Sequence, residues 1–471
     1  MERSQPTGRW DPLWVDQARG RRRTREILFA RPESALALSF AALIVLGAIL
    51  LRLPLAHAGP PVGWVDCLFT ATSAVCVTGL VTVDTATAWS HAGHLIILAL
   101  IQVGGLGIMT FAAFAARIFR MRLSFQSSAA WQGSFFESAA PGDLRKSLGR
   151  IFVSTFVIEA IGATLIWFGL RGAHTPGGPF AAVFHSISAF CNAGFSIYPR
   201  NAVDLQHAPF VLFTLMALIV TGGLGYMVLF EVAARTRRWL RHSQQGAVVW
   251  TLHARIVLCA SGALIIGGMF LLLLVGLGPQ VHGAGHHLFH ALFQSVTART
   301  AGFNTIDIGA LPVPALLILT LLMFIGGSPG SCAGGVKTTA ATVWSARVRA
   351  RLLGREHVTV GRRQVPHEVV RRAALVIATA VLLNAVGVFL LALTESGTPG
   401  VRLEQLLFEQ VSAFGTVGLS ANLTPLLTAP GKLWIVLTMF LGRVGPLTLA
   451  LAVRPSARRL FEYPPERVMI G

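Results

Sequence analysis

Charged side chains are scarce in this chain of 471 residues: Asp, Glu, Lys and Arg make up only 13% of it, whereas 54% is hydrophobic. This balance excludes an ordinary water-soluble globular protein, in which about a quarter of the residues are charged. Acidic residues are the scarcest, 20 against 39 Lys and Arg, so the formal net charge is +19 at pH 7. The composition predicts a basic membrane protein.

Cysteine is also rare, and two common kinds of functional motif are missing. The five cysteines are odd in number and lack metal-ligand spacing, so they predict neither a disulfide framework nor a zinc site. The sequence has no HExxH motif and no nucleotide-binding motif. A membrane-embedded enzyme is therefore the weaker alternative, and we expect no catalytic residues and no resident cofactor. The N-terminus has no short apolar core before a cleavage site, which argues against a removable signal peptide.

Long hydrophobic blocks are what the chain does contain. Each is near or above the ~20 residues that cross ~30 Å of hydrocarbon. They cover residues 35–58, 91–116, 148–170, 209–233, 254–277, 312–345, 373–394 and 431–453. The sixth block is interrupted by a glycine-rich stretch. We predict an all-α membrane protein with eight spanning helices.

Basic residues are concentrated in alternate connections between these blocks and at the two ends of the chain. The basic segments are residues 1–33, 117–150, 235–255, 347–372 and 454–471. Nucleic-acid binding is one explanation of this charge, but the alternation is typical of the positive-inside rule. We therefore predict cytoplasmic termini, with basic segments 1–34 and 457–471, contact with membrane lipids and no nucleic-acid partner. The opposite connections carry few basic residues, Arg299 among them.

One pattern occurs four times, each time between two hydrophobic blocks. It has a Phe, then small and hydroxyl-bearing residues, then a Gly followed by an apolar residue, and it recurs at intervals of roughly 110 residues. The copies read LFTATSAVCVTGLV (68–81), VFHSISAFCNAGFS (183–196), LFQSVTARTAGFNT (292–305) and LFEQVSAFGTVGLS (407–420). The third copy is one residue shorter between its Phe and its Gly, which predicts a local break in the fourfold symmetry.

Each copy predicts one pore repeat: a spanning helix, a short pore helix that enters the membrane, an extended glycine-bearing segment and a second spanning helix. Residues 64–75 and 181–190 are examples of the short helices, about half the length needed to cross. Irregular backbone at membrane depth survives only inside protein or beside water. We therefore expect residues 35–120, 121–240, 241–350 and 351–456 to form four pore repeats around a central ion pore.

The glycine segments offer backbone carbonyls and small side chains, with no ring of carboxylates. Carbonyl rings replace the hydration shell of a monovalent cation, and glycine reaches the φ > 0 angles that aim carbonyls at an axis. The C-terminal ends of the short helices add negative dipole ends. Tight turns or close packing explain one such glycine, but four in phase favour a selectivity filter. The candidate ion-binding residues are Val77, Thr78, Gly79, Asn192, Ala193, Gly194, Thr300, Ala301, Gly302, Thr416, Val417 and Gly418.

The second spanning helices also repeat a glycine cluster, beginning at Gly104, Gly222, Gly326 and Gly442. In the first two repeats, close helix packing by small residues explains it. In the third, GGSPGSCAGGVKTT (326–339) has a composition through which a helix cannot continue. We predict a gating loop at 326–337, across the cavity beneath the filter. The candidate gate residues are Gly326, Gly327, Ser328, Pro329, Gly330, Gly334, Gly335, Lys337 and Arg443.

A few charged residues lie in or near these segments. Arg443, inside a hydrophobic block, is expected to face the pore, where it either ties the broken backbone together or places a positive barrier below the filter. Asp84 and Asp307 each follow a filter glycine by five residues and are expected at the outer mouth, either attracting cations or as solvated loop charges. Lys337 can reach the cytoplasmic interface by its long stem. Glu159 lies inside a block with no partner visible in the sequence.

The four filter segments resemble the Trk/Ktr/HKT superfamily of potassium transporters, most closely the KtrB-type membrane subunits of Ktr systems. The likeness covers nearly the whole chain, and residues 293–305 are a particularly close match. It implies one potassium-selective filter lined by the four repeat glycines, a gating loop in the third repeat and a pore-facing arginine at position 443. In sodium-preferring HKT relatives, serine replaces the first glycine, so Gly79 favours potassium. Sodium conduction by the same architecture is the alternative.

The same resemblance implies a location and partners. The residues before the first block leave no room for the two additional spans of Trk-type subunits, which favours the Ktr type. The resemblance then implies a bacterial inner-membrane protein that forms a homodimer with one pore per protomer. It also implies a cytosolic ring of nucleotide-binding RCK subunits of the KtrA kind, potassium as the transported ion and sodium as a candidate activator.

Overall fold

The computed structural model describes residues 32–118, 144–173, 177–240, 250–281, 283–361 and 363–445. Almost all of the predicted N-terminal segment 1–34 and the whole C-terminal tail 457–471 lie outside these ranges, as does most of the basic connection 117–150.

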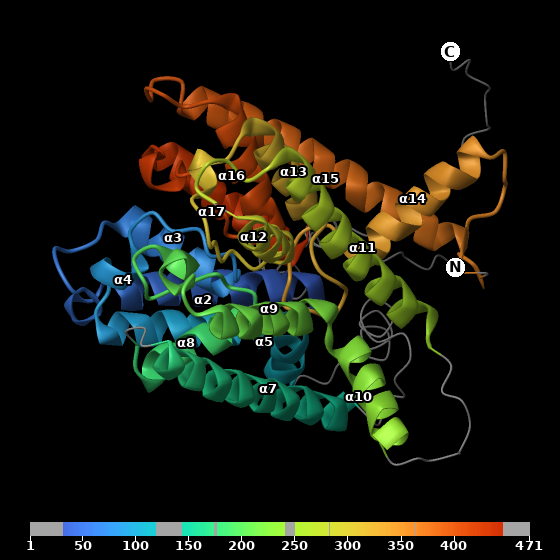
Figure 1. Ribbon diagram of the computed structural model, residues 1–471, viewed down its shortest axis with the longest axis horizontal. Helices are drawn as coiled ribbons and strands as arrows, with labels where there is room; N and C mark the ends of the chain where they lie inside the picture. The colour runs from blue at the N-terminus through green and yellow to red at the C-terminus, as the bar shows by residue number, and fades with distance from the viewer. Residues whose placement is uncertain are drawn as a thin grey trace, which may run out of the picture.

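Four similar groups of helices follow one another along the chain (Figure 1). The long first helices are α2 (Pro32–Arg52), α7 (Leu144–Gly172), α11 (Leu252–Val275) and α15 (His367–Thr394). The short helices are α3 (Trp64–Val75), α8 (Pro179–Phe190), α12 (Ala284–Thr297) and α16 (Leu403–Gly415). The second helices are α5 (His91–Ile118), α9 (Pro209–Leu224) continued by α10 (Tyr226–Leu240), α13 (Val313–Phe324) continued by α14 (Thr338–Leu352), and α17 (Ala429–Val444). The repeated all-α plan predicted from the sequence is therefore present.

The connections carry only short elements. A brief helical turn follows each glycine segment: α4 (Thr85–Ala88), η2 (Asn201–Leu205), η3 (Ile308–Ala310) and η4 (Thr424–Leu426). A further 3₁₀ turn, η1 (Pro54–Ala56), follows α2. Between α14 and α15, β1 (Thr359–Val360) and β2 (Arg363–Gln364) pair antiparallel.

The buried core surrounds the short helices. The Phe that opens each copy of the sequence pattern is 0% exposed in all four repeats, at Phe69, Phe184, Phe293 and Phe408. Each ring therefore anchors its short helix inside the bundle. The long helices instead expose apolar side chains such as Phe156, Ile266 and Leu382, which suits a surface in contact with lipid rather than water.

Helix length supports membrane crossing for part of the bundle. In the described ranges, Gly149–Gly172, Leu252–Val275 and His367–Thr394 are long and apolar enough to cross, and α9 with α10 qualifies as a fourth, bent span. Shorter apolar helices are Ala37–Arg52, Trp64–Val75, His91–Gly107, Pro179–Phe190 and Val313–Phe324. Two of these are the predicted entering helices α3 and α8. The count of eight spans stays a prediction.

The second helix of repeat 2 is broken, although the sequence predicted one continuous span over 209–233. The axes of α9 and α10 are bent by 110° at Gly225, which has φ +83°, a region that favours glycine. Tyr226 donates its backbone N–H to the Gly330 carbonyl of repeat 3 at 3.2 Å. The break is therefore stabilised by another repeat, and α10 turns away from the line of α9 and runs downward in the view of Figure 1.

Candidate functional site

The glycines of the four predicted filter segments (77–79, 192–194, 300–302 and 416–418) meet around one centre. An added Cβ on Gly79 would lie 3.1 Å from the Gly194 Cα, and one on Gly194 would lie 2.8 Å from the Gly302 Cα. The series continues from Gly302 to Gly418 at 3.1 Å and returns from Gly418 to Gly79 at 3.0 Å. No side chain fits at these positions without displacing backbone. The repeats therefore follow one another around the ring in sequence order.

The backbone of each filter segment alternates in handedness. The glycines have φ of +93°, +68°, +79° and +94° in repeats 1 to 4. The residue two positions earlier is also left-handed in every repeat: Val77 (φ +56°), Asn192 (+60°), Thr300 (+68°) and Thr416 (+49°). Left-handed backbone is a genuine outlier for β-branched residues and costs roughly 1–3 kcal/mol each. The same conformation in all four segments, at a β-branched residue in three of them, indicates a function for it.

Hydroxyl groups on the short helices hold the filter segments from behind. Ser73 and Ser412 each accept a hydrogen bond from the backbone N–H of their filter glycine, at 3.0 and 3.2 Å. Ser188, at the same position of repeat 2, donates to the Phe195 carbonyl at 2.8 Å. Thr297 occupies this position in repeat 3, and its hydroxyl has no partner among the described residues. Repeat 3 is therefore tied less tightly to its helix.

The predicted irregularity of repeat 3 is visible in the backbone. Ala301 donates its N–H to the Thr297 carbonyl, four residues back, at 2.9 Å. In the other repeats the equivalent bond reaches five residues back, as from Thr78 to Ser73 at 2.8 Å. The missing residue is thus lost between the short helix and the filter segment, and the symmetry is broken there as expected.

The glycine clusters of the second helices allow close approach to the short helices. A Cβ on Gly104 would collide with the Val75 carbonyl at the end of α3, and one on Gly222 with the Phe190 carbonyl at the end of α8. One on Gly442 would collide with the Phe414 carbonyl, one residue before the end of α16. The contact is the same in three repeats, so it is backbone packing against the C-terminal end of a short helix. The packing interpretation offered for repeats 1 and 2 therefore extends to repeat 4.

In repeat 3 the second helix is interrupted, as its composition predicted. α13 ends at Phe324, α14 begins at Thr338, and no helix is assigned between them. The chain doubles back on itself, because Gly326 donates its N–H to the Val336 carbonyl at 2.9 Å. An added Cβ on Gly334 would collide with the Thr416 side chain. Loop 326–337 thus lies directly against a filter residue.

Loop 326–337 also contacts the second helices of the other repeats. The Ser328 N–H donates to the Gly223 carbonyl of α9 at 3.1 Å, and the Cys332 thiol donates to the Gly105 carbonyl of α5 at 3.3 Å. Residues 326–330 have G-x-S-x-G spacing, which in hydrolases marks a strand-to-helix turn. Here Ser328 is inside the loop, and its hydroxyl accepts from Thr338 Oγ1 at 3.2 Å. The spacing therefore belongs to the loop and not to a nucleophile turn.

Arg443 joins this loop to the rest of the bundle. Its side chain is 4% exposed, Nη1 donates to the Cys332 carbonyl, and Nη2 donates to the Gly104 carbonyl of α5 at 2.6 Å. One guanidinium group thus links repeats 4, 3 and 1. The expected contact with loop carbonyls is present, whereas the barrier to cations stays a prediction.

Arg299 is a site residue that sequence reasoning missed, because it was counted as a charge of an outer connection. It directly precedes the filter segment of repeat 3, is 8% exposed, and its Nη2 donates to the Gly326 carbonyl at 3.4 Å. Aligning the four copies would have revealed it, since the same position holds Cys76, Cys191 and Gly415 in the other repeats. Two buried arginines therefore contact loop 326–337.

Two further charged residues have partners inside the bundle. The Lys337 amine donates to the Ala333 carbonyl, so its side chain turns back onto the loop. Glu159, whose partner the sequence did not reveal, accepts from Gln102 Nε2 at 3.0 Å and lies 3.8 Å from the Cys191 thiol. Glu159 therefore connects the first helix of repeat 2 to repeat 1 and to the end of α8.

Asp84 and Asp307 are both exposed in the turns that follow a filter segment, and both cap those turns. Asp84 accepts from the Ala86 N–H at 3.0 Å at the start of α4. Asp307 accepts from the Gly309 N–H at 3.0 Å and from Asn422 Nδ2 of repeat 4 at 2.8 Å. Their carboxylates thus have structural partners in addition to any effect on cations.

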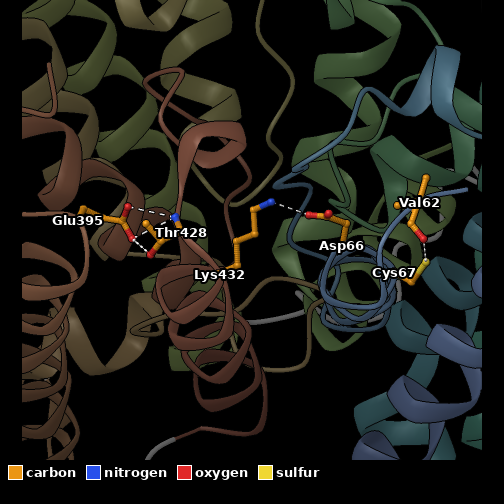
Figure 2. Close-up of polar contacts among 6 residues, drawn as sticks. All are labelled: Val62, Asp66, Cys67, Glu395, Thr428 and Lys432. Carbon is orange, nitrogen blue, oxygen red and sulfur yellow. Dashed lines mark hydrogen bonds and ion pairs between the residues drawn. The ribbon is translucent and has the colours of Figure 1, made fainter. Parts of the chain in front are cut away.

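Side chains also close the ring where the chain itself does not connect repeats 4 and 1. Lys432 of α17 and Asp66 of α3 form a half-buried ion pair of 2.7 Å (Figure 2). Beside it, Glu395 accepts hydrogen bonds from the backbone and the hydroxyl of Thr428, the N-cap of α17 (Figure 2). The junction between the last repeat and the first is therefore held by charge.

Comparison with known proteins adds a family. The sequence model of the TrkH family, described as cation transport protein, matches residues 18–461. The Ktr system potassium uptake protein B of Bacillus subtilis is 36% identical over 447 residues, which cover 93% of this chain and 97% of that protein. The potassium/sodium uptake protein NtpJ of Enterococcus hirae is 34% identical over 453 residues, 93% and 97% of the two chains.

A solved structure gives the same fold. The crystal structure of the potassium transporter TrkH from Vibrio parahaemolyticus matches with a TM-score of 0.70 at 18% identity, covering 89% of this chain and 84% of that chain. The all-α pore architecture expected from the sequence is therefore confirmed.

Proposed function

Because this chain belongs to the TrkH family of cation transport proteins, we propose that it takes up potassium through the ring of its four filter segments. The family makes it a multi-pass membrane transporter and not an enzyme. The observation that carries the proposal is the closed ring of glycines, in which each repeat touches the next. The names of the relatives in Bacillus and Enterococcus include potassium uptake, which agrees with this choice of ion.

The proposed selectivity rests on backbone geometry. Carbonyls alternate sides along an ordinary extended strand, but residues that alternate between left- and right-handed φ turn successive carbonyls to one side. The filter segments have this alternation in all four repeats. Four such segments around one centre supply oxygens that replace the water around a monovalent cation. The ion-binding residues are the twelve of the filter segments, and the C-terminal ends of α3, α8, α12 and α16 add negative dipole ends.

The proposed gate is loop 326–337. It lies against Thr416 of the filter and is held by two arginines from different repeats. In this position it obstructs the path below the filter, so conduction requires the loop to move. Arg443 both latches the loop and places a positive charge near the path, which opposes a passing cation. Asp84 and Asp307, exposed beyond the filter, raise the local cation concentration at the outer mouth.

The alternative function is conduction of sodium, or poor discrimination between the two ions. The name of the Enterococcus relative includes both potassium and sodium, and carbonyl filters differ in selectivity by small changes in geometry. Gly79 in the first filter segment favours potassium. Sodium is also the candidate activator.

Regulation is proposed to come from a cytosolic partner. The Bacillus relative is named as protein B of a Ktr system, which implies a membrane subunit that works with other components. We place the chain in the bacterial inner membrane as a homodimer, with both termini cytoplasmic and a nucleotide-binding RCK ring on that side. The exposed basic ends of α10 and α14 are the surfaces offered to such a ring.

Uptake by cells tests the function directly. A bacterial strain without potassium uptake systems, expressing this chain with and without its cytosolic partner, should grow at low potassium and take up ⁸⁶Rb⁺. Excess K⁺ should compete with this uptake, and the same concentration of Na⁺ should compete far less. Equal competition by Na⁺ would support the alternative, and no uptake with either ion would refute both.

A further inference from the structure

One position next to the filter differs in chemistry among the repeats. It is the residue that directly follows the buried Phe of each short helix, which we call the brace position. The four residues are Thr70, His185, Gln294 and Glu409. All four side chains are buried, at 0 or 1% exposure. Four different side chains at one buried position of a repeated unit suggest different tasks.

In repeat 4 the brace position holds the chain just beyond the filter. Glu409 Oε1 accepts from Ser420 Oγ at 2.5 Å and from the Ala421 N–H at 3.0 Å. Its Oε2 accepts from Thr424 Oγ1 at 2.6 Å. Ser420 is the second residue after Gly418. The two carboxyl oxygens thus hold the extended segment that follows the filter and the turn after it.

Repeat 2 has a simpler brace, a neutral imidazole ring with one contact to the segment after the filter glycine. His185 Nδ1 contacts the Ala181 carbonyl at 2.8 Å, and since a carbonyl only accepts, Nδ1 carries the proton. Its Nε2 therefore accepts from Ser196 Oγ, at 2.9 Å. Ser196 is the second residue after Gly194, so it matches Ser420 of repeat 4. The two braces reach the same point of their segments.

Repeats 1 and 3 have no such brace. The Thr70 hydroxyl and both polar atoms of the Gln294 amide have no partner among the described residues. Repeat 3 has a tie one helical turn further out, where His290 Nδ1 contacts Thr305 Oγ1 at 2.8 Å. Because the repeats follow one another around the ring in sequence order, the two braced segments lie on opposite sides of the pore.

We propose that Glu409 is a positioning residue for cation selectivity, with His185 as its weaker counterpart across the pore. The inference rests on the proposed potassium filter. Glu409 does not touch the ion. It holds the extended segment after Gly418 in place, and this segment in turn keeps the carbonyls of residues 416–418 in position. A filter distinguishes K⁺ from Na⁺ only while its oxygens keep their spacing. Loss of the contacts to this segment should therefore lower selectivity before it lowers the amount of folded protein.

The unbraced repeats supply matched controls. Glu409→Leu keeps most of the volume but leaves the buried Ala421 N–H and two hydroxyls without their acceptor. Glu409→Gln keeps one oxygen for the Ala421 N–H and can donate to Thr424, so it should rescue much of the loss. Gln294→Leu makes a similar change of a buried polar side chain that braces nothing. If Glu409 served folding alone, the two leucine variants would differ in the yield of folded protein but not in their preference for K⁺ over Na⁺.

The test uses the full chain in proteoliposomes with ⁸⁶Rb⁺ uptake. The measured quantity is the ratio of the Na⁺ to the K⁺ concentration that halves uptake, which does not depend on how much protein folded. We expect Glu409→Leu to lower this ratio about tenfold, Glu409→Gln to stay within about threefold of the wild type, and Gln294→Leu to leave it unchanged. His185→Phe should lower the ratio by less than Glu409→Leu does.

Several results would overturn the inference. If Glu409→Leu keeps the wild-type ratio, the inference is refuted while the proposed potassium filter stands. The same holds if Gln294→Leu lowers the ratio as much as Glu409→Leu does. If the wild type shows no preference for K⁺ over Na⁺, the proposed filter and this inference are both refuted. If Glu409→Leu yields no folded protein, Ser420→Ala takes its place, because it removes the 2.5 Å contact to Glu409 and a 3.1 Å contact from Thr424 but leaves the Glu409 bonds to Ala421 and Thr424 in place. It should lower the ratio about threefold relative to Thr70→Val, and equality of these two variants would refute the brace.

Discussion

Replacing Arg443 with Ala should open the pore. The guanidinium group donates one hydrogen bond to the Cys332 carbonyl of loop 326–337 and one of 2.6 Å to the Gly104 carbonyl of α5. Hydrogen bonds to a charged group contribute about 1.5–3 kcal/mol each. Only the bond to the Cys332 carbonyl is broken when the loop moves, so we take about 2 kcal/mol for it, which changes the ratio of closed to open loop by about 30-fold.

The expected rise in flux is smaller than this ratio, because uptake cannot increase beyond the point where the loop is always open. We expect at least a tenfold higher initial rate of ⁸⁶Rb⁺ uptake into proteoliposomes, at equal amounts of folded protein. Loss of the positive charge acts in the same direction, because it removes a barrier to the cation.

A lysine variant separates the two contributions. Arg443→Lys keeps the charge but lacks the planar fork that reaches two carbonyls at once. High flux in both variants identifies the latch as the main effect, whereas high flux in Arg443→Ala alone identifies the charge. An Arg443→Ala protein that elutes as folded and transports no faster than the wild type would refute the assignment of this arginine to the gate.

Three other substitutions test the ring and its supports. Gly79→Ser places a Cβ against the Ala193 carbonyl at a φ of +93°, so with roughly 1–3 kcal/mol of strain it should lower the preference for K⁺ over Na⁺ in competition assays. An unchanged preference would mean that Gly79 does not shape the filter. Gly442→Val would collide with the Phe414 carbonyl, whereas a Cβ at Gly262 has nothing within 4 Å. Gly442→Val should therefore lower the thermal unfolding temperature in detergent, through an overpacking cost of about 1–3 kcal/mol, and Gly262→Val should not. Equal shifts in the two variants would contradict the packing role of Gly442. Lys432→Met leaves the half-buried Asp66 unpaired and should destabilise the fold by less than the ~3–5 kcal/mol of a fully buried pair, with recovery when Asp66→Leu is added; no recovery would show that the ion pair is not what holds the 4–1 junction.

The sequence alone determined the repeated parts of this protein. A pattern used four times between long apolar blocks predicts four similar units, and glycine at one position of each predicts left-handed backbone there. The interruption after α13 was equally predictable, because five glycines and a proline within residues 326–339 exclude a continuous helix whatever surrounds them. These are properties of local composition and of internal similarity, so they need no knowledge of contacts.

Only the tertiary structure decided what the repeats do differently. The letters GGLG occur at 104–107 inside the continuous helix α5 and at 222–225, where α9 ends and Tyr226 donates to a carbonyl of the repeat 3 loop. Aligning the four copies marks Arg299 as unusual, but only the fold shows that it contacts Gly326. Glu409 and Gln294 look equivalent in the sequence, yet Glu409 holds the segment after Gly418, whereas the Gln294 amide has no partner in the described part of the chain. Such differences depend on partners that are far apart along the chain, and the hydrophobic pattern of a sequence does not indicate which partner a buried polar group contacts.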